Sequence, residues 1–142
     1  MNVYFACSIT GGRDFERVYQ EIVRALAEAG HLVPTAHLAA SDVVTVEAGI
    51  DPQEVYGRDI GWIRGCDLLI AEASVPSHGV GYEIGFALGL GKPVLVLYKQ
   101  GRKLSKMIGG NPDPNLAVRT YATPEEAIAY VENYLNNYKL CL

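Results

Sequence analysis

Residues 67–85, DLLIAEASVPSHGVGYEIG, contain the pattern that decides the fold. Residues 68–71 are apolar throughout, which is typical of a central strand that is buried on both faces. A loop follows at residues 74–79, and a helix is predicted from about Val80 to Gly89–Gly91, where glycines end it. The order strand, loop, helix is the repeating unit of a parallel α/β sheet.

The same alternation continues on both sides of this stretch. Short apolar runs predict four more strands, at residues 3–6, 31–34, 93–98 and 116–120. Apolar residues at helical spacing predict a helix over residues 14–29. Asp51-Pro52 and Thr123-Pro124 each combine an N-cap residue with a first-turn proline, so further helices are predicted to start there, the last one ending near residue 138. Residues 103–108 are predicted as a short helix, and residues 41–50, which show no pattern, as a loop.

Five alternations of strand and helix predict one domain over residues 1–142 with an α/β fold. We expect a doubly wound, flavodoxin- or Rossmann-like parallel sheet of five strands in the order 2-1-3-4-5. Such sheets bind ligands at the carboxyl ends of the first and third strands, where the order reverses. Both of these strands are followed by glycine-rich loops, so a single cleft is predicted.

Composition and charge restrict the possible functions. The net charge of −4, from 12 Lys and Arg against 16 Asp and Glu, argues against a general nucleic-acid binder. Three cysteines without a C-x-x-C motif indicate reduced thiols and a cytoplasmic protein, with Cys7 as a small buried residue. No signal peptide is visible, and no apolar stretch approaches the roughly 20 residues needed to span a bilayer, so membrane association is not expected.

The first glycine loop offers donors for an anion. Ser8, Thr10 and Arg13 surround the backbone N–H groups of Gly11 and Gly12 at the start of a helix. Free N–H groups and the helix dipole favour an anion such as phosphate at that place. The alternative is a tight turn from strand to helix with no ligand.

The second loop places a carboxylate among glycines. Glu83 falls in the predicted first helical turn, where the dipole would help to keep it ionised. An ionised carboxylate facing a sugar can attack the anomeric carbon, and Asp59 could be the second group that such chemistry needs. The alternatives are that Glu83 only caps its helix, and that Asp59 is a solvated acid or an ion-pair partner of Arg58 or Arg64.

Five segments carry a family resemblance, which covers about residues 3–110 in order. They are residues 4–13, 35–40, 58–62, 71–85 and 104–108. Together they resemble the 2′-deoxynucleoside 5′-phosphate N-hydrolases, relatives of the nucleoside 2-deoxyribosyltransferases. The resemblance implies that Glu83 is a nucleophile forming a glycosyl-enzyme intermediate, that Asp59 assists departure of the base or orients the sugar, and that Tyr4 lies near both the sugar and Glu83.

The resemblance also implies a substrate site and a homodimer. The residues implied to line the cleft or hold the 5′-phosphate are Ser8, Ile9, Thr10, Gly11, Gly12, Arg13, His37, Ser77 and Gly79. Ser105 and Met107 are implied to complete the neighbouring subunit's site. Thr10 stands where the animal members carry Arg, so the phosphate contacts differ at that position.

The function expected from these residues is an N-glycosidase. It would hydrolyse (2′-deoxy)nucleoside 5′-monophosphates to free base and (deoxy)ribose 5-phosphate. No metal or other cofactor is expected, because no ligand cluster has suitable spacing. Two alternatives remain: a nucleoside 2-deoxyribosyltransferase, which would share Glu83 and Asp59, and a non-catalytic nucleotide-binding module.

Overall fold

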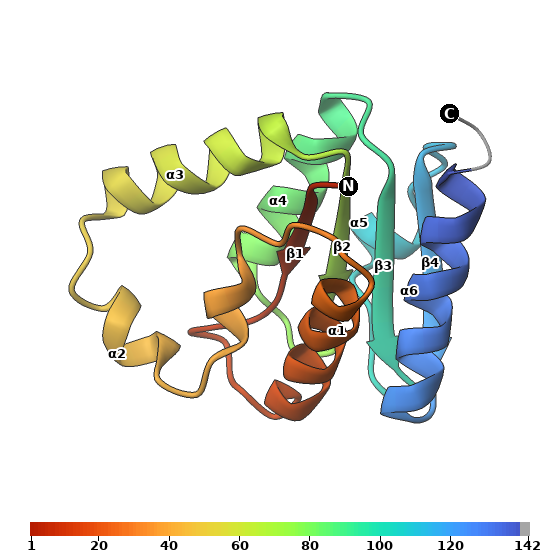
Figure 1. Ribbon diagram of the computed structural model, residues 1–142, viewed down its shortest axis with the longest axis horizontal. Coiled ribbons are helices and arrows are strands. Elements are labelled where there is room, and N and C mark those ends of the chain that lie inside the picture. The colour runs from red at the N-terminus through yellow and green to blue at the C-terminus, as the bar shows by residue number, and fades with distance from the viewer. Residues whose placement is uncertain (140–142) are drawn as a thin grey trace.

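The computed structural model describes residues 1–139, and its centre is a four-stranded parallel sheet (Figure 1). The strands follow one another in the spatial order β1-β2-β3-β4. They are β1 (Val3–Ala6), β2 (Leu68–Glu72), β3 (Val94–Lys99) and β4 (Leu116–Tyr121). Every residue of β1 and β2 is buried, as expected for strands covered on both faces.

Helices cover both faces of this sheet, so the predicted α/β doubly wound arrangement is confirmed. The helical segments are α1 (Glu16–Glu28), η1 (Ala36–Ala39), α2 (Val43–Glu47), α3 (Pro52–Gly65), α4 (His78–Gly89), α5 (Lys106–Gly109) and α6 (Pro124–Lys139). One core packs α1 and α6 against the sheet, and a second core packs α3 and α4 against the opposite face. Within residues 1–139, no helix has the length and apolarity to cross a membrane.

The predicted fifth strand at residues 31–34 is wrong, and so is the order 2-1-3-4-5 of a five-stranded sheet. Only Leu32 forms an isolated parallel bridge beside β1. Pro34 has no N–H group and cannot extend a ladder. The next β1 donor, the Phe5 N–H, bonds instead to the side-chain Oγ1 of Thr35 at 2.9 Å. The chain therefore leaves the sheet after one bridge, at the place where the strand was expected.

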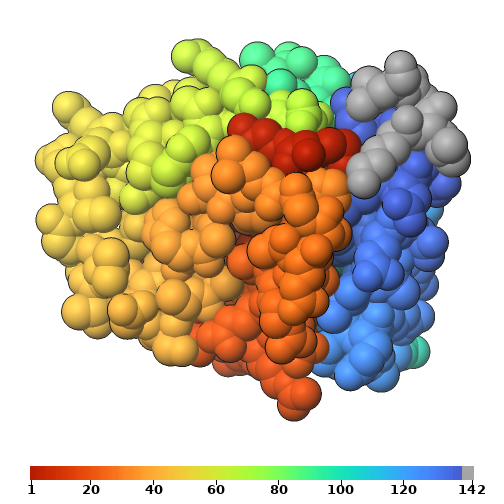
Figure 2. Space-filling view, viewed as in Figure 1, coloured from red at the N-terminus to blue at the C-terminus, as the bar shows by residue number. Residues whose placement is uncertain are grey.

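The predicted loop at residues 41–50 is also wrong, because α2 lies there. It is anchored by Val43, which is buried in the core. Five residues make little more than one turn, which is too short to show helical periodicity in the sequence. With the start of α3, this segment forms the end of the molecule opposite α6 (Figures 1 and 2).

The helix after β2 begins earlier than the sequence predicted. Ser77 is its N-cap and accepts a hydrogen bond from the Val80 N–H at 3.4 Å, so α4 starts at His78. Glu83 consequently lies in the second turn of α4 rather than the first. The contribution of the helix dipole is weaker there, since it falls off within the first turn.

Candidate active site

Two adjoining cavities lie at the carboxyl ends of β1 and β2, where the cleft was predicted. The first, about 460 Å³, is lined by three acids, Glu47, Asp59 and Glu83, and we call it the carboxylate cavity. The second, about 850 Å³, is the outer cavity, bounded by α4 and by the segment around α5. The residues that line both cavities are Thr10, Ser77, Gly79 and Val80.

Glu83 is held by a tyrosine from the first strand. The hydroxyl of Tyr4, a fully buried residue, donates a hydrogen bond of 2.7 Å to Oε1 of Glu83. Burial raises the pKa of Tyr4 and the charge of Glu83 raises it further, so the phenol stays protonated and remains a donor. The structure thus brings together two predicted site residues that are 79 positions apart in the sequence.

Burial also decides the ionisation of Glu83. Desolvation raises its pKa to about 7, against an ordinary value of 4.5. The hydrogen bond from Tyr4 lowers the pKa and the charge of Asp59 raises it, but burial is the largest influence. The helix dipole was expected only to assist the ionisation of Glu83, and its contribution of about 0.3–1 kcal/mol is smaller than this desolvation.

Asp59 forms one of the ion pairs that the sequence offered as an alternative, and it also lies in the cavity with Glu83. It is ion-paired with Arg58, whose Nε donates to Oδ1 of Asp59 at 2.9 Å. Arg58 in turn bonds both carboxylate oxygens of Glu47 in α2, at 3.0 and 3.1 Å. A residue of the segment predicted as a loop is therefore linked to the acid-bearing helix.

The glycines of the first loop allow it to touch the second loop. A Cβ atom on Gly11 would lie 2.6 Å from the carbonyl oxygen of Pro76 and 2.9 Å from Oγ of Ser8, so only glycine fits. Gly12 has a φ of +130°, which also favours glycine. Ser8 is fully buried, and its hydroxyl has no hydrogen-bond partner among residues 1–139. Ser8 lines neither cavity, so its role in phosphate binding stays a prediction.

Arg13 is not brought to either cavity. Its Nε pairs with Glu16 at 3.2 Å, and its two terminal nitrogens donate to four backbone carbonyls. These carbonyls belong to Ser8, Leu38, Ala39 and Ala40. The guanidinium thus ties the first loop to η1.

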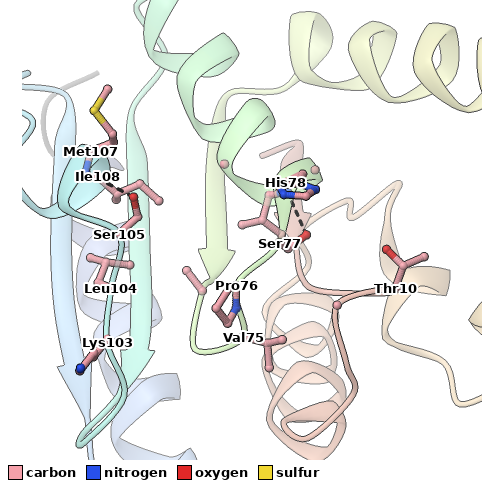
Figure 3. Close-up of a pocket in the computed structure, with 15 residues that line it drawn as sticks. Thr10, Val75, Pro76, Ser77, His78, Lys103, Leu104, Ser105, Met107 and Ile108 are labelled. Atoms are coloured by element: carbon pink, nitrogen blue, oxygen red, sulfur yellow. Dashed lines mark hydrogen bonds between the residues drawn. The ribbon is translucent and has the colours of Figure 1, made fainter.

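The other predicted site residues divide between the cavities. Ile9 lines the carboxylate cavity, and Ser105 and Met107 line the outer one. Figure 3 shows Ser105 and Met107 across the outer cavity from Ser77, and Met107 is 84% exposed. His37 lines neither cavity; its Nε2 lies 3.4 Å from Glu47.

Some lining residues were missed or left undecided by sequence reasoning. Two aromatic side chains, Tyr56 and Tyr82, line the carboxylate cavity with their hydroxyls 3.3 Å apart. Tyr56 was detectable, since it lies one helical turn before Asp59 on the same face of the helix, whereas no spacing rule points to Tyr82. The residues of the outer cavity with basic side chains are His78 and Lys103.

The remaining reactive groups are inert or dispersed. Cys7 lines the carboxylate cavity, but burial raises the pKa of its thiol to about 12, so it is a poor nucleophile. Its predicted burial is confirmed, whereas Cys141 lies outside the described residues. Across residues 1–139, the structure gathers no three or more His, Cys, Asp or Glu side chains that could hold a metal ion.

Comparison with known proteins places the chain in a family. Residues 3–134 match the family described as nucleoside 2-deoxyribosyltransferase. A Methanosarcina mazei protein provisionally named 2′-deoxynucleoside 5′-phosphate N-hydrolase 1 is 42% identical over 124 residues, covering 87% of this chain and 77% of that protein. The Mus musculus 5-hydroxymethyl-dUMP N-hydrolase is 40% identical over 142 residues, covering 96% and 79% respectively.

A solved structure supports the fold. The Clostridium botulinum CMP N-glycosidase BcmB superposes with a TM-score of 0.71 over 93% of this chain and 98% of that one, at 23% identity. At that identity the likeness bears on the fold alone. The family resemblance noted in the sequence is confirmed by the matches to residues 3–134 and to both N-hydrolases. The chain therefore belongs to the nucleoside 2-deoxyribosyltransferase family.

Proposed function

We propose that this protein hydrolyses the N-glycosidic bond of (2′-deoxy)nucleoside 5′-monophosphates to free base and (deoxy)ribose 5-phosphate. The observation that carries the proposal is the 2.7 Å hydrogen bond from Tyr4 to Glu83 in a cavity that also contains Asp59. A nucleotide-binding module would gain nothing from two acids beside an anion. The N-hydrolase names of relatives near 40% identity support the same class of reaction.

Glu83 is the nucleophile in this mechanism. Its carboxylate attacks the anomeric carbon of the sugar, the bond to the base breaks, and a covalent glycosyl-enzyme forms. Water then attacks the same carbon and releases the sugar 5-phosphate with net retention. The raised pKa of about 7 fits this role, because a desolvated carboxylate is more reactive than a hydrated one but is still substantially ionised at neutral pH.

Tyr4 and Asp59 orient the reaction. Tyr4 holds Oε1 of Glu83, so that the second oxygen is left for attack. Asp59 assists departure of the base, either as a proton carrier or by fixing the sugar, from the helix that forms another wall of the cavity. Cleavage of a glycosidic bond commonly uses two acids, one as the nucleophile and one that assists the leaving group.

The 5′-phosphate binds where the two cavities join. Thr10, Ser77 and Gly79 line both cavities there, at the N-terminus of α4. The free N–H groups of that terminus and of the Gly11-Gly12 loop supply donors. Arg13 contributes by fixing the shape of the loop, since its donors already bond Glu16 and backbone carbonyls.

The active form is a homodimer in this proposal. Ser105 and Met107 lie on the open side of the outer cavity, where a partner could use them to close the neighbouring site. An exposure of 84% for a methionine is consistent with a side chain that becomes buried by a partner. Light scattering would measure the assembly, and mixing Glu83→Ala with Met107→Ala subunits would restore activity only if sites are shared.

Base release from a panel of nucleotides tests the function. The panel contains ribo- and deoxyribonucleoside 5′-monophosphates with the matching nucleosides, analysed by chromatography. We expect release from monophosphates, reduced at least 10²–10³-fold in Glu83→Ala. Glu132→Ala, on the exposed surface of α6, is the matched control. Release only after a second base is added would identify a transferase, and binding without release would identify a binding module.

A further inference from the structure

Three linked charged side chains lie along one wall of the carboxylate cavity, where Arg58 joins the two lining acids Glu47 and Asp59. Glu47 accepts a two-pronged bond from the terminal nitrogens of Arg58, and the Nε of Arg58 donates to Asp59. The exposed fractions of the three side chains are only 12%, 21% and 17%. At such low exposure, solvent screens the three charges far less than it screens a surface pair.

Arg58 is fixed on its other sides as well. Its guanidinium lies over the ring of Trp62, 5.0 Å from the ring centre. His37 packs edge-on against the same ring at 5.8 Å and approaches Glu47 with its Nε2. Only arginine could make all these contacts, because its planar fork offers separate donor edges and a flat face for stacking.

The geometry points to Glu47 and Arg58 as positioning residues for Asp59, an inference that rests on the proposed function. Arginine commonly bonds a carboxylate through two parallel N–H groups. Glu47 occupies the terminal nitrogens, so Arg58 offers Asp59 only its Nε. One Asp59 oxygen is held, and no described residue donates a hydrogen bond to the other, Oδ2. In the cavity that Asp59 lines, this oxygen remains available to the sugar or the leaving base.

The same arrangement controls the charge that Glu83 experiences. The charge of Asp59 is one of the causes that raise the pKa of Glu83. Burial alone would raise the pKa of Glu47, but hydrogen bonds from Arg58 and His37 hold it below its ordinary value, so Glu47 stays ionised and keeps Arg58 engaged. The titratable groups involved are Tyr4, His37, Glu47, Arg58, Asp59 and Glu83.

Removing the charge of Glu47 and removing that of Arg58 should shift the pKa of Glu83 in opposite directions. In Glu47→Gln a negative charge is lost and Arg58 is free to pair fully with Asp59, so the pKa of Glu83 falls. In Arg58→Met the positive charge is lost, so the pKa of Glu83 rises. Both variants should lower kcat by roughly tenfold to a hundredfold, because Oδ2 of Asp59 is captured by Arg58 in Glu47→Gln, and Oδ1 loses its Arg58 donor in Arg58→Met.

The Arg58→Lys variant distinguishes the effect of the positive charge from the effect of holding Asp59 in position. Lysine keeps the positive charge but cannot bridge two carboxylates through a planar fork, so we expect a lowered kcat with the Glu83 titration near that of the wild type. Arg17→Met, which replaces an exposed side chain of α1 and breaks its 2.8 Å pair with Glu21, should change neither property. If Arg58→Met does not fold, as judged by circular dichroism, Glu47→Gln and Arg58→Lys together carry the test.

Two measurements on the full chain decide the matter: the pH profile of kcat, and carbon-13 NMR titration of the Glu83 carboxyl group, which needs no turnover. Unchanged kcat and titration in Glu47→Gln would overturn the inference, as would full activity in Arg58→Lys. If the wild type releases no base, the proposed function fails. Opposite NMR shifts in Glu47→Gln and Arg58→Met would then still support control through Asp59, and equal titrations would overturn it.

Discussion

Replacing Glu83 with glutamine should remove catalysis and stabilise the protein, and the gain in stability should depend on pH. Folding raises the pKa of Glu83 from 4.5 to about 7, so the folded chain binds this proton more tightly than the unfolded chain. The free energy of unfolding therefore falls as pH rises from 4.5 to 7. Above pH 7 the ionised side chain costs the folded state about 3 kcal/mol, at about 1.4 kcal/mol per tenfold change in ionisation constant.

Glutamine keeps the shape of Glu83 and an oxygen for the Tyr4 hydroxyl, but it does not ionise. We expect Glu83→Gln to raise the free energy of unfolding by about 3 kcal/mol at pH 8 and by under about 1 kcal/mol at pH 5. Urea denaturation of the two proteins, followed by circular dichroism at both pH values, measures this difference.

Glu132→Gln, on the exposed surface of α6, serves as the control and should have little effect at either pH. Equal or lower stability of Glu83→Gln at pH 8 would show that Glu83 ionises in the fold without cost. The desolvation that we assign to its cavity would then be refuted.

Three further substitutions test separate contacts. Tyr4→Phe removes a donor to the ionised Glu83, so the acid limb of the kcat/KM profile, expected near pH 7, should move to higher pH and activity should fall about tenfold or more. Gly11→Ala forces a Cβ atom to within 2.6 Å of the Pro76 carbonyl and should cost about 1–3 kcal/mol in urea denaturation. Thr35→Val leaves a buried β1 N–H group unbonded and should lower the free energy of unfolding, again by about 1–3 kcal/mol in urea denaturation.

The parts of the fold that depend on local pattern could be predicted from the sequence. The apolar runs in β1 and β2, and the capping residues Asp51 and Thr123, act within a few positions of themselves. The meeting of the two glycine loops followed from sheet topology. The contact of Tyr4 with Glu83 came only from the family resemblance, because no spacing rule links residues so far apart.

The predictions that were wrong concern features that depend on tertiary contacts. The run at residues 31–34 is apolar enough for a strand, but the Thr35 hydroxyl takes the bond that a strand would have used. Helix α2 has too few residues to show a period, and it carries Glu47. The raised pKa of Glu83 comes from the surroundings of its side chain, which the position of Glu83 in a helix could not reveal.

The early exit of the chain beside β1 bears on aggregation. A bare sheet edge presents unpaired N–H and C=O groups on which another chain can form a strand. On the β1 side, the Thr35 hydroxyl accepts a hydrogen bond from the Phe5 N–H, so this edge group is no longer unpaired. On the β4 side, the exposed residue Arg119 bonds the Val118 carbonyl with its own guanidinium at 2.8 Å and adds a charge. We expect the folded protein to resist strand-to-strand aggregation, and Thr35→Val to weaken that protection on the side where the missing strand would have been.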